Sequence, residues 1–382
     1  MKKTFELEQQ TSMWHFQGRE AGAALRATEV KPKLDRFLIE WCKKMHQLDI
    51  LKEKKNWLAD KDHPAFAYKL RIVNKGNIVK EQLPGRNSLF FGNMGDDSDE
   101  KKMLTKAKES LQLTIMCFNR ELLEKLTECL PTFFLLTNFG TRQSKGFGSF
   151  VLKNSAVKAE QLLTDWYGAK PIYKIDYGRM NICKEEEKVF RDIEVIYQVL
   201  KGGINFGIYI KGFINRYYLN ENNQYGLNIR IGGEKRYLKE HKIAPCKGRR
   251  PVEKVDEYRY IRALLGTSDS QSWGGFVVRF AGGDIERIPS PILFKPLANR
   301  IYILPNDVNP NIYGKKFKFS SDWGKGELNI PAKNEFDMDK FFAAFVDDLN
   351  STDIRDTIKK LKNTPMFAKN NIKVLPCKGV KN

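Results

Sequence analysis

The first 153 residues carry two hydrophobic periods in a regular order. Apolar and polar side chains alternate with a period of two, which predicts strands at residues 5–8, 65–73, 111–117 and 147–152. Apolar side chains recur at three- and four-residue steps, which predicts amphipathic helices across residues 25–48 and from Asn119 to a C-cap at Gly140. The order strand, helix, strand, strand, helix, strand is that of a ferredoxin-like domain, expected to span residues 1–153.

A polar insertion separates the two central strands of this domain. Its GDDSDE run, residues 95–100, offers carboxylates to a metal ion, or it marks the start of a helix, where acidic side chains are stabilising. We favour the helix, predicted over residues 100–110, and expect no metal.

The second half has a less regular pattern. It predicts a strand near residues 172–177, a helix near 185–200, strand-like runs over 204–213, a helix over 255–265 ended by Gly266, strands near 276–280 and 301–304, and a helix over 335–349. These elements predict a second α+β domain over residues 154–334 and a helical tail over residues 335–382.

The charge of the chain indicates the kind of partner. Lys and Arg number 66 against 46 Asp and Glu, a formal net charge of +20. Such an excess repels itself in a compact protein, so a polyanionic partner is expected, and nucleic acid is the first candidate.

Membranes, metals and cofactors are not expected from the sequence. No apolar run approaches about eighteen residues, and the N-terminal MKKTFELEQQ lacks the apolar core of a secretory signal. The six cysteines include no C-x-x-C pair and no nearby histidine pair, which indicates neither a zinc site nor a disulfide framework. We therefore expect a cytoplasmic protein without a membrane partner or cofactor.

Residues 138–150, NFGTRQSKGFGSF, form a glycine-rich loop between the second predicted helix and the last strand. The loop lacks the glycine-lysine-hydroxyl spacing of a Walker loop. A dinucleotide fingerprint lies between a strand and a helix, the reverse of the order here. An RRM aromatic motif is a weak match, because the extra Ser149 shifts Phe150 to the opposite strand face.

The chemistry of this loop favours close approach to a polyanion. Glycines remove side-chain obstruction, and exposed main-chain N–H groups with basic side chains suit phosphate oxygens. The residues concerned are Gly140, Arg142, Lys145, Gly146 and Gly148. Phe147 is placed either to stack on a base or to pack in the core. A turn that only joins two elements explains the same glycines, and spacing alone leaves both readings open.

A second basic segment, residues 235–250, holds seven Lys or Arg against one Glu. That density favours counterion release on a phosphate backbone, and the interleaved Tyr237 and His241 suit contacts with RNA. We predict RNA contacts at Lys235, Arg236, Lys247, Arg249 and Arg250. A solvated surface loop is the alternative. The KKFKF run at residues 315–319 alternates charge and aromatic rings and predicts a half-buried strand.

The G-T-R-x-S-K-G-F-G-S loop, the LRATEVKPKL segment that opens the first helix, and the order of elements resemble the RAMP superfamily of CRISPR effector subunits. The resemblance implies two ferredoxin-like, RRM-like domains, the second divergent and carrying insertions. It implies that Arg26, Thr28, Lys31 and Lys33 lie near the guide-RNA backbone, beside the loop residues Gly140, Arg142, Lys145, Gly146 and Gly148.

The resemblance is good over residues 1–153 and loose afterwards. There YIRALLGTSDSQSWGGFVVRF and IPSPILFKPL are similar to remnants of a second RAMP-type domain that lacks its own glycine loop. Ala27 and Pro32 stand where the family usually has glycine. Within the superfamily the chain is most similar to the subunit that caps the guide 3′ end in type III-B (Cmr) complexes. The implied partners are guide RNA, target RNA and other RAMP subunits, in antiviral defence.

Some RAMP proteins cleave RNA, so an acid or base has to be sought. His15, between Trp14 and Phe16, is the best candidate for acid–base work, with Lys31 stabilising the developing charge. An edge-strand histidine with a hydrogen bond explains His15 more simply. We expect a non-catalytic RNA-binding subunit, with a metal-independent ribonuclease that processes guide RNA as the alternative. A basic protein unrelated to CRISPR is a third possibility.

Overall fold

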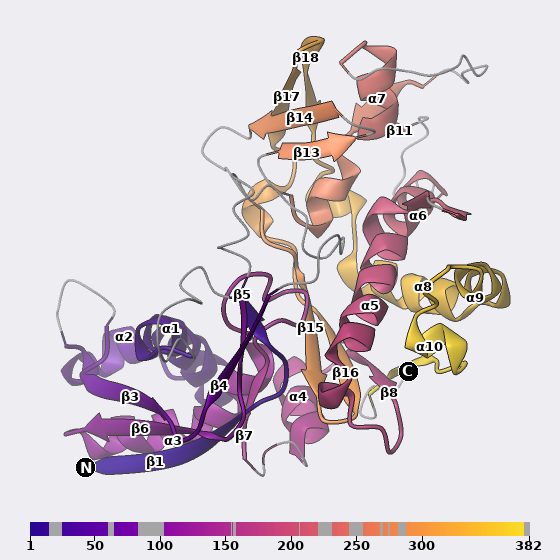
Figure 1. Ribbon diagram of the computed structural model, residues 1–382. Coiled ribbons are helices and arrows are strands. Elements are labelled where there is room, and N and C mark those ends of the chain that lie inside the picture. Colours follow the sequence, from indigo (N-terminus) through magenta and orange to yellow (C-terminus); the bar gives the residue numbers. More distant parts are fainter. Residues whose placement is uncertain are drawn as a thin grey trace.

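The computed structural model shows an α+β protein in which mixed sheets pack against helices (Figure 1). The structure describes residues 1–14, 25–59, 65–82, 103–153, 155, 158–205, 207–220, 231–243, 255–267, 270–273, 276–281 and 288–377. In this part of the chain no helix is long and apolar enough to cross a membrane.

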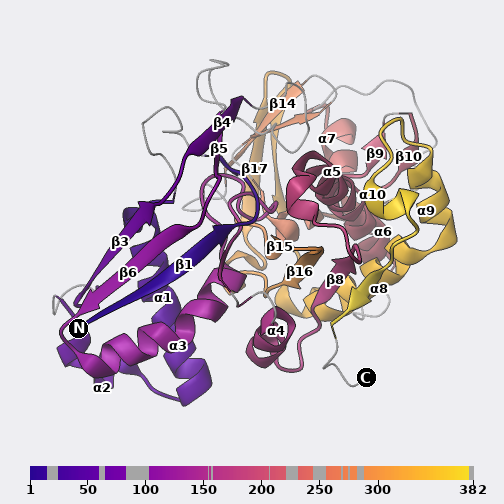
Figure 2. The ribbon, with the colours of Figure 1, turned by 60° about the horizontal axis from the view of Figure 1, so that its bottom comes forward.

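The first sheet has the strand order β3-β6-β1-β7, and all its neighbouring strands are antiparallel. The strands are β1 (Lys2–Gln9), β3 (Tyr68–Asn74), β6 (Leu111–Cys117) and β7 (Phe150–Leu152). Helices α1 (Ala27–His46) and α3 (Arg120–Leu136) cover one face of this sheet (Figure 2). The sequence-predicted order of strands and helices in this half is confirmed.

The two helices form for the reasons that the hydrophobic pattern gives. In α1, Val30, Leu34 and Leu38 fall on one buried stripe. In α3, the Asn119 side chain caps the helix by accepting from the Leu122 N–H at 3.0 Å. The expected C-cap at Gly140 is wrong, because α3 ends at Leu136 and Thr137 is already extended.

A small three-stranded sheet corrects the helix predicted over residues 100–110. Its order is β2-β5-β4, with β2 (Met13–Trp14), β4 (Ile78–Gln82) and β5 (Met103–Ala107). Strand β5 pairs with both neighbours, and these backbone hydrogen bonds outweigh the local helix preference of a short segment. The GDDSDE run lies outside the described residues.

The second half builds a further four-stranded sheet with the order β15-β16-β8-β19. Its strands are β8 (Tyr173–Asp176), β15 (Ile292–Leu297), β16 (Arg300–Pro305) and β19 (Val374–Pro376). The segment expected as a helical tail holds α8 (Met338–Asn350), α9 (Thr352–Lys359) and α10 (Met366–Lys369), followed by β19. Because β19 pairs with β8, residues after 335 complete the second sheet.

Helix α5 (Glu186–Tyr197) lies beside this sheet and ends in a wider π turn, Gln198–Gly202. The helical prediction for residues 185–200 is therefore confirmed. The apolar runs over 204–213 form only the short strands β9 (Ile204–Asn205) and β10 (Tyr209–Ile210) before α6 begins. The other helices are α2 (Ile50–Glu53), α4 (Ala159–Tyr167), α6 (Phe213–Asn220) and α7 (Glu234–Glu240).

A six-stranded sheet at the top of Figure 1 has the order β11-β12-β18-β17-β14-β13. Its strands are β11 (Ile231–Gly233), β12 (Glu257–Arg259), β13 (Ser270–Trp273), β14 (Phe276–Ala281), β17 (Lys316–Ser321) and β18 (Gly324–Asn329). The helix predicted over residues 255–265 is wrong, because β12 pairs with β11 and β18 and only a 3₁₀ turn, Ile261–Leu265, follows. The half-buried strand at residues 315–319 is confirmed, with Phe317 and Phe319 buried.

The two hydrophobic cores exchange side chains across the boundary between the halves. Trp14 and Phe147, from the first half, are buried in the core of the second. Leu297, Tyr302 and Leu304, from the second half, are buried in the core of the first. This interlocking fixes the glycine-rich loop between the two halves.

Candidate nucleic-acid interface

The glycine-rich loop joins α3 to β7 and closes on itself. Asn138 and Ser149 form a bridge, and the Phe139 N–H donates to the Gly148 carbonyl at 2.9 Å. Gly140 and Gly148 have φ values of +78° and +63°, which favour glycine. A Cβ atom on Gly140 would lie 2.5 Å from the Trp14 carbonyl oxygen. Glycine is thus required because the loop approaches its own chain.

Main-chain N–H groups of this loop donate within the protein. The Gly140 N–H donates to a Glu29 carboxylate oxygen at 2.7 Å. The remaining donors are Thr141 to Trp14, Lys145 to Arg142, Gly146 to Gln143, and Gly148 to Ser12. These five N–H groups are not exposed donors of the kind the sequence suggested, so contact with a phosphate at these positions falls to side chains.

The same loop binds the edge strand of the second sheet. The Phe294 N–H of β15 donates to the Ser144 carbonyl at 3.2 Å. The Asn138 amide donates to the Phe294 carbonyl at 2.9 Å, and the Ser149 hydroxyl donates to the Pro296 carbonyl at 2.8 Å. The loop therefore covers an otherwise open strand edge and holds the two halves together.

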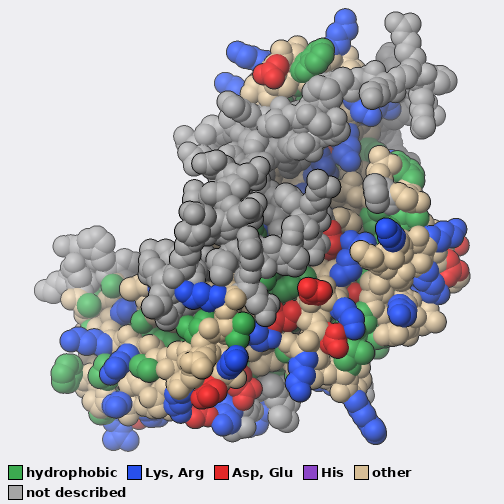
Figure 3. Space-filling view, in the orientation of Figure 1, with side chains coloured by type: hydrophobic (Ala, Val, Ile, Leu, Met, Phe, Trp, Pro, Cys, Tyr) green, Lys and Arg blue, Asp and Glu red, His purple; other side chains and the backbone are tan. Residues whose placement is uncertain are grey.

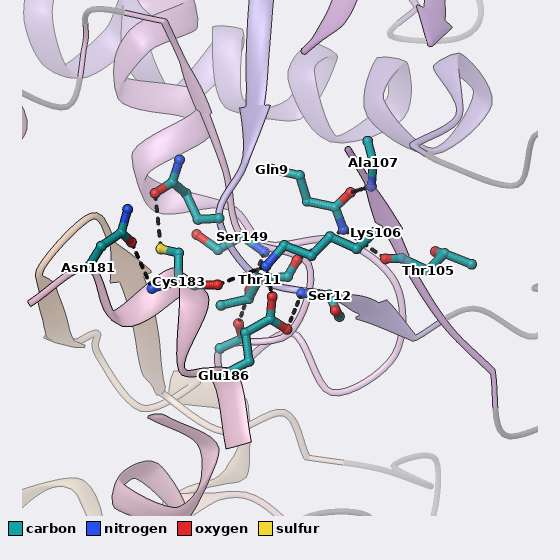
Figure 4. A network of polar contacts seen from close by, with 12 residues as sticks. Gln9, Thr11, Ser12, Thr105, Lys106, Ala107, Ser149, Asn181, Cys183 and Glu186 are labelled. Atoms are coloured by element: carbon teal, nitrogen blue, oxygen red, sulfur yellow. Dashed lines mark hydrogen bonds and ion pairs between the residues drawn. The ribbon is translucent and has the colours of Figure 1, made fainter. Parts of the chain in front are cut away.

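A polar network beneath the loop extends this junction (Figure 4). The Thr11 hydroxyl donates to the Gly146 carbonyl at 2.6 Å and accepts from the Ser149 N–H at 3.0 Å. Glu186, at the start of α5, accepts from the Ser12 N–H at 2.9 Å and pairs with Lys106. The first strands, the loop and α5 are thereby locked into one unit.

Three candidate residues of the loop have different surroundings. Arg142 is half-buried with its guanidinium 5.8 Å from the Trp14 ring centroid. Lys145 is buried, with its Nζ atom over the Tyr197 ring. Phe147 is fully buried and stacks on Phe190 at 3.9 Å between ring centroids. In this conformation Phe147 therefore packs in the core, the second of its two predicted positions.

Helix α1 brings its first turns to the loop. The Lys33 Nζ donates to the Asn138 carbonyl at 3.2 Å and to Gln143 Oε1 at 2.9 Å, while pairing with Glu29 at 3.3 Å. Burial lowers the pKa of Lys33, and the Glu29 charge opposes that shift. Lys33 is thus a direct link between α1 and the loop.

The other α1 candidates lie around this link. Arg26 is the half-buried N-cap residue and Thr28 is exposed. The Lys31 Nζ pairs with Asp35 at 2.8 Å and donates to the Phe66 carbonyl at 3.1 Å. Lys31 is therefore bound within its own domain, whereas Thr28 faces solvent.

The second basic segment begins on α7. Lys235 is exposed and donates to the Gly202 carbonyl at 3.2 Å, and Arg236 pairs with Glu240 at 2.7 Å. The predicted contacts Lys247, Arg249 and Arg250, and the candidate acid–base residue His15, lie outside the described residues. Among the described residues, no group of three or more His, Cys, Asp or Glu is placed to hold a metal ion.

Two lysines that sequence analysis missed lie against the loop. The Lys295 side chain, from β15, is fully buried and donates to the Thr137 carbonyl, Asn138 Oδ1 and the Phe150 carbonyl at 3.1, 3.1 and 2.9 Å. Lys201, from the π turn after α5, lies 5.8 Å from the centroid of the Tyr197 ring. Nothing in their local sequence marks them, because the carbonyl oxygens that they bind, of Gly266 for Lys201 and of Thr137 for Lys295, are distant along the chain.

The contribution of the Lys201 amine to the stability of the free protein is expected to rise as the pH rises from about 7.5 to about 9.5. Burial, followed by Arg262, lowers the pKa of Lys201 from 10.5 to about 7. Between these values the unfolded chain binds a proton at this amine that the folded chain does not, so the contribution of Lys201 to stability rises with pH, by up to about 1.4 kcal/mol per pH unit. The groups that face Lys201 are Lys145, Tyr197, Glu234 and Arg262.

Urea unfolding across this pH range measures the slope. The Lys201→Met variant should show a smaller slope than the wild type because it lacks this titrating amine. Equal slopes in the two proteins would contradict the lowered pKa.

Charge alone does not locate a nucleic-acid site on the described surface. Figure 3 shows Lys and Arg side chains spread over the described parts of one face, with Asp and Glu among them. The distinguishing feature is the junction itself, where α1, the glycine-rich loop and the π turn after α5 bring Lys33, Arg142, Lys145 and Lys201 to one region.

Comparison with known families accounts for nearly the whole chain. Residues 1–204 match the Cmr1 N-terminal domain, and residues 209–370 match the Cmr1 C-terminal domain. The chain belongs to the Cmr1 family. The resemblance to RAMP-type subunits of type III CRISPR effector complexes is thereby confirmed, and the chain is a Cmr1-type subunit of the type III-B complex.

Solved structures show only distant likeness to this Cmr1 family member. The crystal structure of apo Cmr1 from Pyrococcus furiosus has 12% sequence identity and a TM-score of 0.43, with all of both chains covered. A chain of the type III-B Cmr-β structure, bound to cognate target RNA, has 10% identity and a TM-score of 0.25 over 40% of this chain and 58% of that one. Likeness at this level carries no argument about function. No curated protein matches the sequence.

Proposed function

We propose that this Cmr1 family member is a non-catalytic subunit that binds guide RNA and caps its 3′ end within the type III-B effector complex. The observation that carries the proposal is the match of both halves to Cmr1 domains, over residues 1–204 and 209–370. The net charge of +20 supports a polyanionic ligand. The strand orders of the two four-stranded sheets support a pair of ferredoxin-like domains of the RAMP type.

The RNA-binding surface in this proposal is the junction of α1, the glycine-rich loop and α5. The Arg142 guanidinium lies beside the Trp14 ring, and the Lys33 amine donates to Gln143 of the loop. Because N–H groups of the loop are used within the protein, affinity for RNA comes from cationic side chains and is therefore strongly salt-dependent. Guide and target RNA and the other RAMP subunits are the proposed partners.

Binding of a fluorescent single-stranded RNA to the full chain, measured by anisotropy over a salt series, tests this function. The Arg142→Ala variant should weaken binding and reduce the slope of log affinity against log salt by about one unit, because one phosphate contact is lost. The matched control is Arg120→Ala, which removes an exposed arginine paired with Glu124 on α3. An unchanged slope in Arg142→Ala would count against the loop as the binding surface.

The same RNA distinguishes capping from general binding and from cleavage. A bulky block on the 3′ end should weaken binding more than the same block on the 5′ end. Equal effects would remove the capping role. Discrete cleavage products that disappear in His15→Ala would overturn the non-catalytic proposal in favour of a guide-processing ribonuclease.

A further inference from the structure

The first sheet has a face that its helices do not cover. Leu113 and Ile115 of β6 belong to the core under α1 and α3, so the alternate residues of this strand point to the opposite side (Figure 2). There Met116 lies between Lys2 of β1 and Lys69 of β3, which are its register partners. The outer face, as we call it, comprises these three residues and the next row, Thr4, Thr114 and Arg71.

Three cations of the outer face carry no counter-charge. The Lys2, Lys69 and Arg71 side chains are exposed. Within the described part of the chain, none of the three forms a hydrogen bond or an ion pair through its side chain. They come from two strands that flank β6, so the fold brings together positive charges that are separate in the sequence. A polyanion bound there would neutralise them.

The other end of β1 shows a different arrangement of charge on the same side of the sheet. Glu6 pairs there with Lys75 at 2.9 Å and with Lys153 at 2.7 Å. Glu8, two residues further along the strand, lies close enough to Lys153 to stabilise its charge. The acidic residues of β1 are therefore matched by lysines at that end, and the uncompensated positive charge is confined to the outer face.

An exposed aromatic ring stands beside the outer face. Phe118, which directly follows β6, is 100% exposed, whereas Cys117 before it is buried and Met116 is 37% exposed. This alternation continues the period of the strand, so Phe118 points to the same side as Met116. A single exposed ring is common on protein surfaces. Next to three unpaired cations it completes the set of groups that bind an unpaired nucleotide strand.

These groups fit single-stranded RNA better than an acidic protein. Cationic side chains bind phosphates, an aromatic ring stacks on an unpaired base, and a sheet face leaves both groups accessible. Interfaces between proteins, in contrast, are depleted in lysine relative to the rest of the surface. Charge complementarity therefore favours RNA as the occupant.

We propose that the outer face binds a stretch of single-stranded guide RNA, with its three cations at phosphates and Phe118 stacked on a base. The inference rests on the proposed function, in which the guide end lies at the glycine-rich loop. That loop meets the other end of β1, where the Gln10 N–H donates to the Ser149 carbonyl at 2.8 Å. The outer face is thus a second RNA contact, separate from the loop.

The length of β1 sets the distance between the two contacts. Its eight residues, Lys2–Gln9, span about 24 Å at about 3.4 Å per residue. A strand of RNA with about 3.4 Å between nucleotides covers that distance in about seven nucleotides. A guide held at the loop can therefore reach the outer face with the same strand.

Two kinds of substitution test the two kinds of contact in the full chain. Lys69→Gln combined with Arg71→Gln should weaken binding of a single-stranded RNA of about twenty nucleotides by about tenfold or more, and should reduce the salt slope by about 1.4 units. Phe118→Ala should weaken binding by about tenfold with an unchanged slope, and Phe118→Trp should restore it, because stacking involves no counterion release. The melting temperatures should not change, since these side chains are exposed.

Matched controls remove the same groups elsewhere. Lys52→Gln combined with Lys359→Gln removes two positive charges from exposed ion pairs on α2 and α9. Tyr209→Ala removes an exposed ring from β10. Both should leave RNA affinity and salt slope at the wild-type values.

The outcomes separate this inference from the proposed function. If the outer-face variants bind RNA like the wild type while Arg142→Ala binds more weakly, the inference fails and the proposed function stands. If the wild type does not bind RNA, both fail. One RNA per chain is expected, and two would overturn a single guide strand as the occupant. If the variants bind RNA normally but no longer assemble with the other subunits of the type III-B complex, the outer face docks a protein and RNA is overturned as its ligand.

Discussion

Gly148→Ala is expected to destabilise the protein by about 3 kcal/mol or more, one of the largest effects of any single substitution in this chain. Gly148 has a φ of +63°, and a Cβ atom there would overlap the backbone carbonyl of Phe139. The left-handed conformation alone costs an alanine about 1–2 kcal/mol, and the overlap adds to this because backbone atoms cannot rotate away. To relieve this overlap the backbone of the loop would have to move, which would break the Phe139–Gly148 hydrogen bond that closes the loop.

Gly178→Ala is the matched control for this prediction. Gly178 has a nearly identical φ of +65°, but a Cβ atom there meets no atom within 4 Å. The free energy of unfolding of Gly178→Ala should therefore fall only by the cost of the left-handed conformation, about 1–2 kcal/mol. Urea unfolding of the two variants measures the difference, and equal losses would show that the close approach to Phe139 does not exist in solution.

The first half of the fold was predictable because its elements are long and strongly periodic. The stripe through Val30, Leu34 and Leu38 specifies α1 by itself, and the alternation in Leu111–Cys117 specifies β6. The exceptions are the strands of the small sheet, β2, β4 and β5, of which β5, Met103–Ala107, was predicted as part of a helix. Its five residues carry no clear period, and its strand pairing comes from β2 and β4, which the local sequence does not contain.

The second half was less predictable because its sheet joins segments far apart in the chain. Strand β19 pairs with β8 across about two hundred residues, and its three residues carry no pattern of their own. In the same way Ile261, Leu264 and Leu265 have helical spacing, yet they form a 3₁₀ turn after a short strand. Tertiary pairing decides such short elements.

In the candidate site, too, the features that depend on the local sequence were predicted, and the contacts with residues distant in the chain were not. The glycines of the loop indicated close approach to a backbone, which the structure shows at Gly140 and Gly148. The backbone that lies close to these glycines belongs to the protein itself, at Trp14 and Phe139. No local sequence pattern predicts that these two residues are the neighbours. Lys201 and Lys295 were missed for the same reason, because they are single lysines whose hydrogen-bond acceptors lie more than sixty residues away.

Lys295→Met is expected to lower the free energy of unfolding by about 2–4 kcal/mol, because three buried oxygen atoms lose their donor. The Lys295 side chain is fully buried, and its amine joins the end of α3, Asn138 and β7 across the boundary between the halves. Methionine retains the volume, so the loss reports the hydrogen bonds rather than a cavity. Lys316→Met, which removes an exposed pair with Glu327, should change stability by less than about 1 kcal/mol.

The pH dependence gives this prediction a second readout. Burial lowers the pKa of Lys295 well below its usual value, so between the folded and unfolded pKa values the unfolded chain binds the additional proton. The contribution of Lys295 to stability should therefore rise with pH in this window, and Lys295→Met should lose that contribution. Urea midpoints measured at several pH values test both points. A variant as stable as the wild type, with an unchanged pH slope, would mean that the amine is solvated and that the halves are not joined through Lys295.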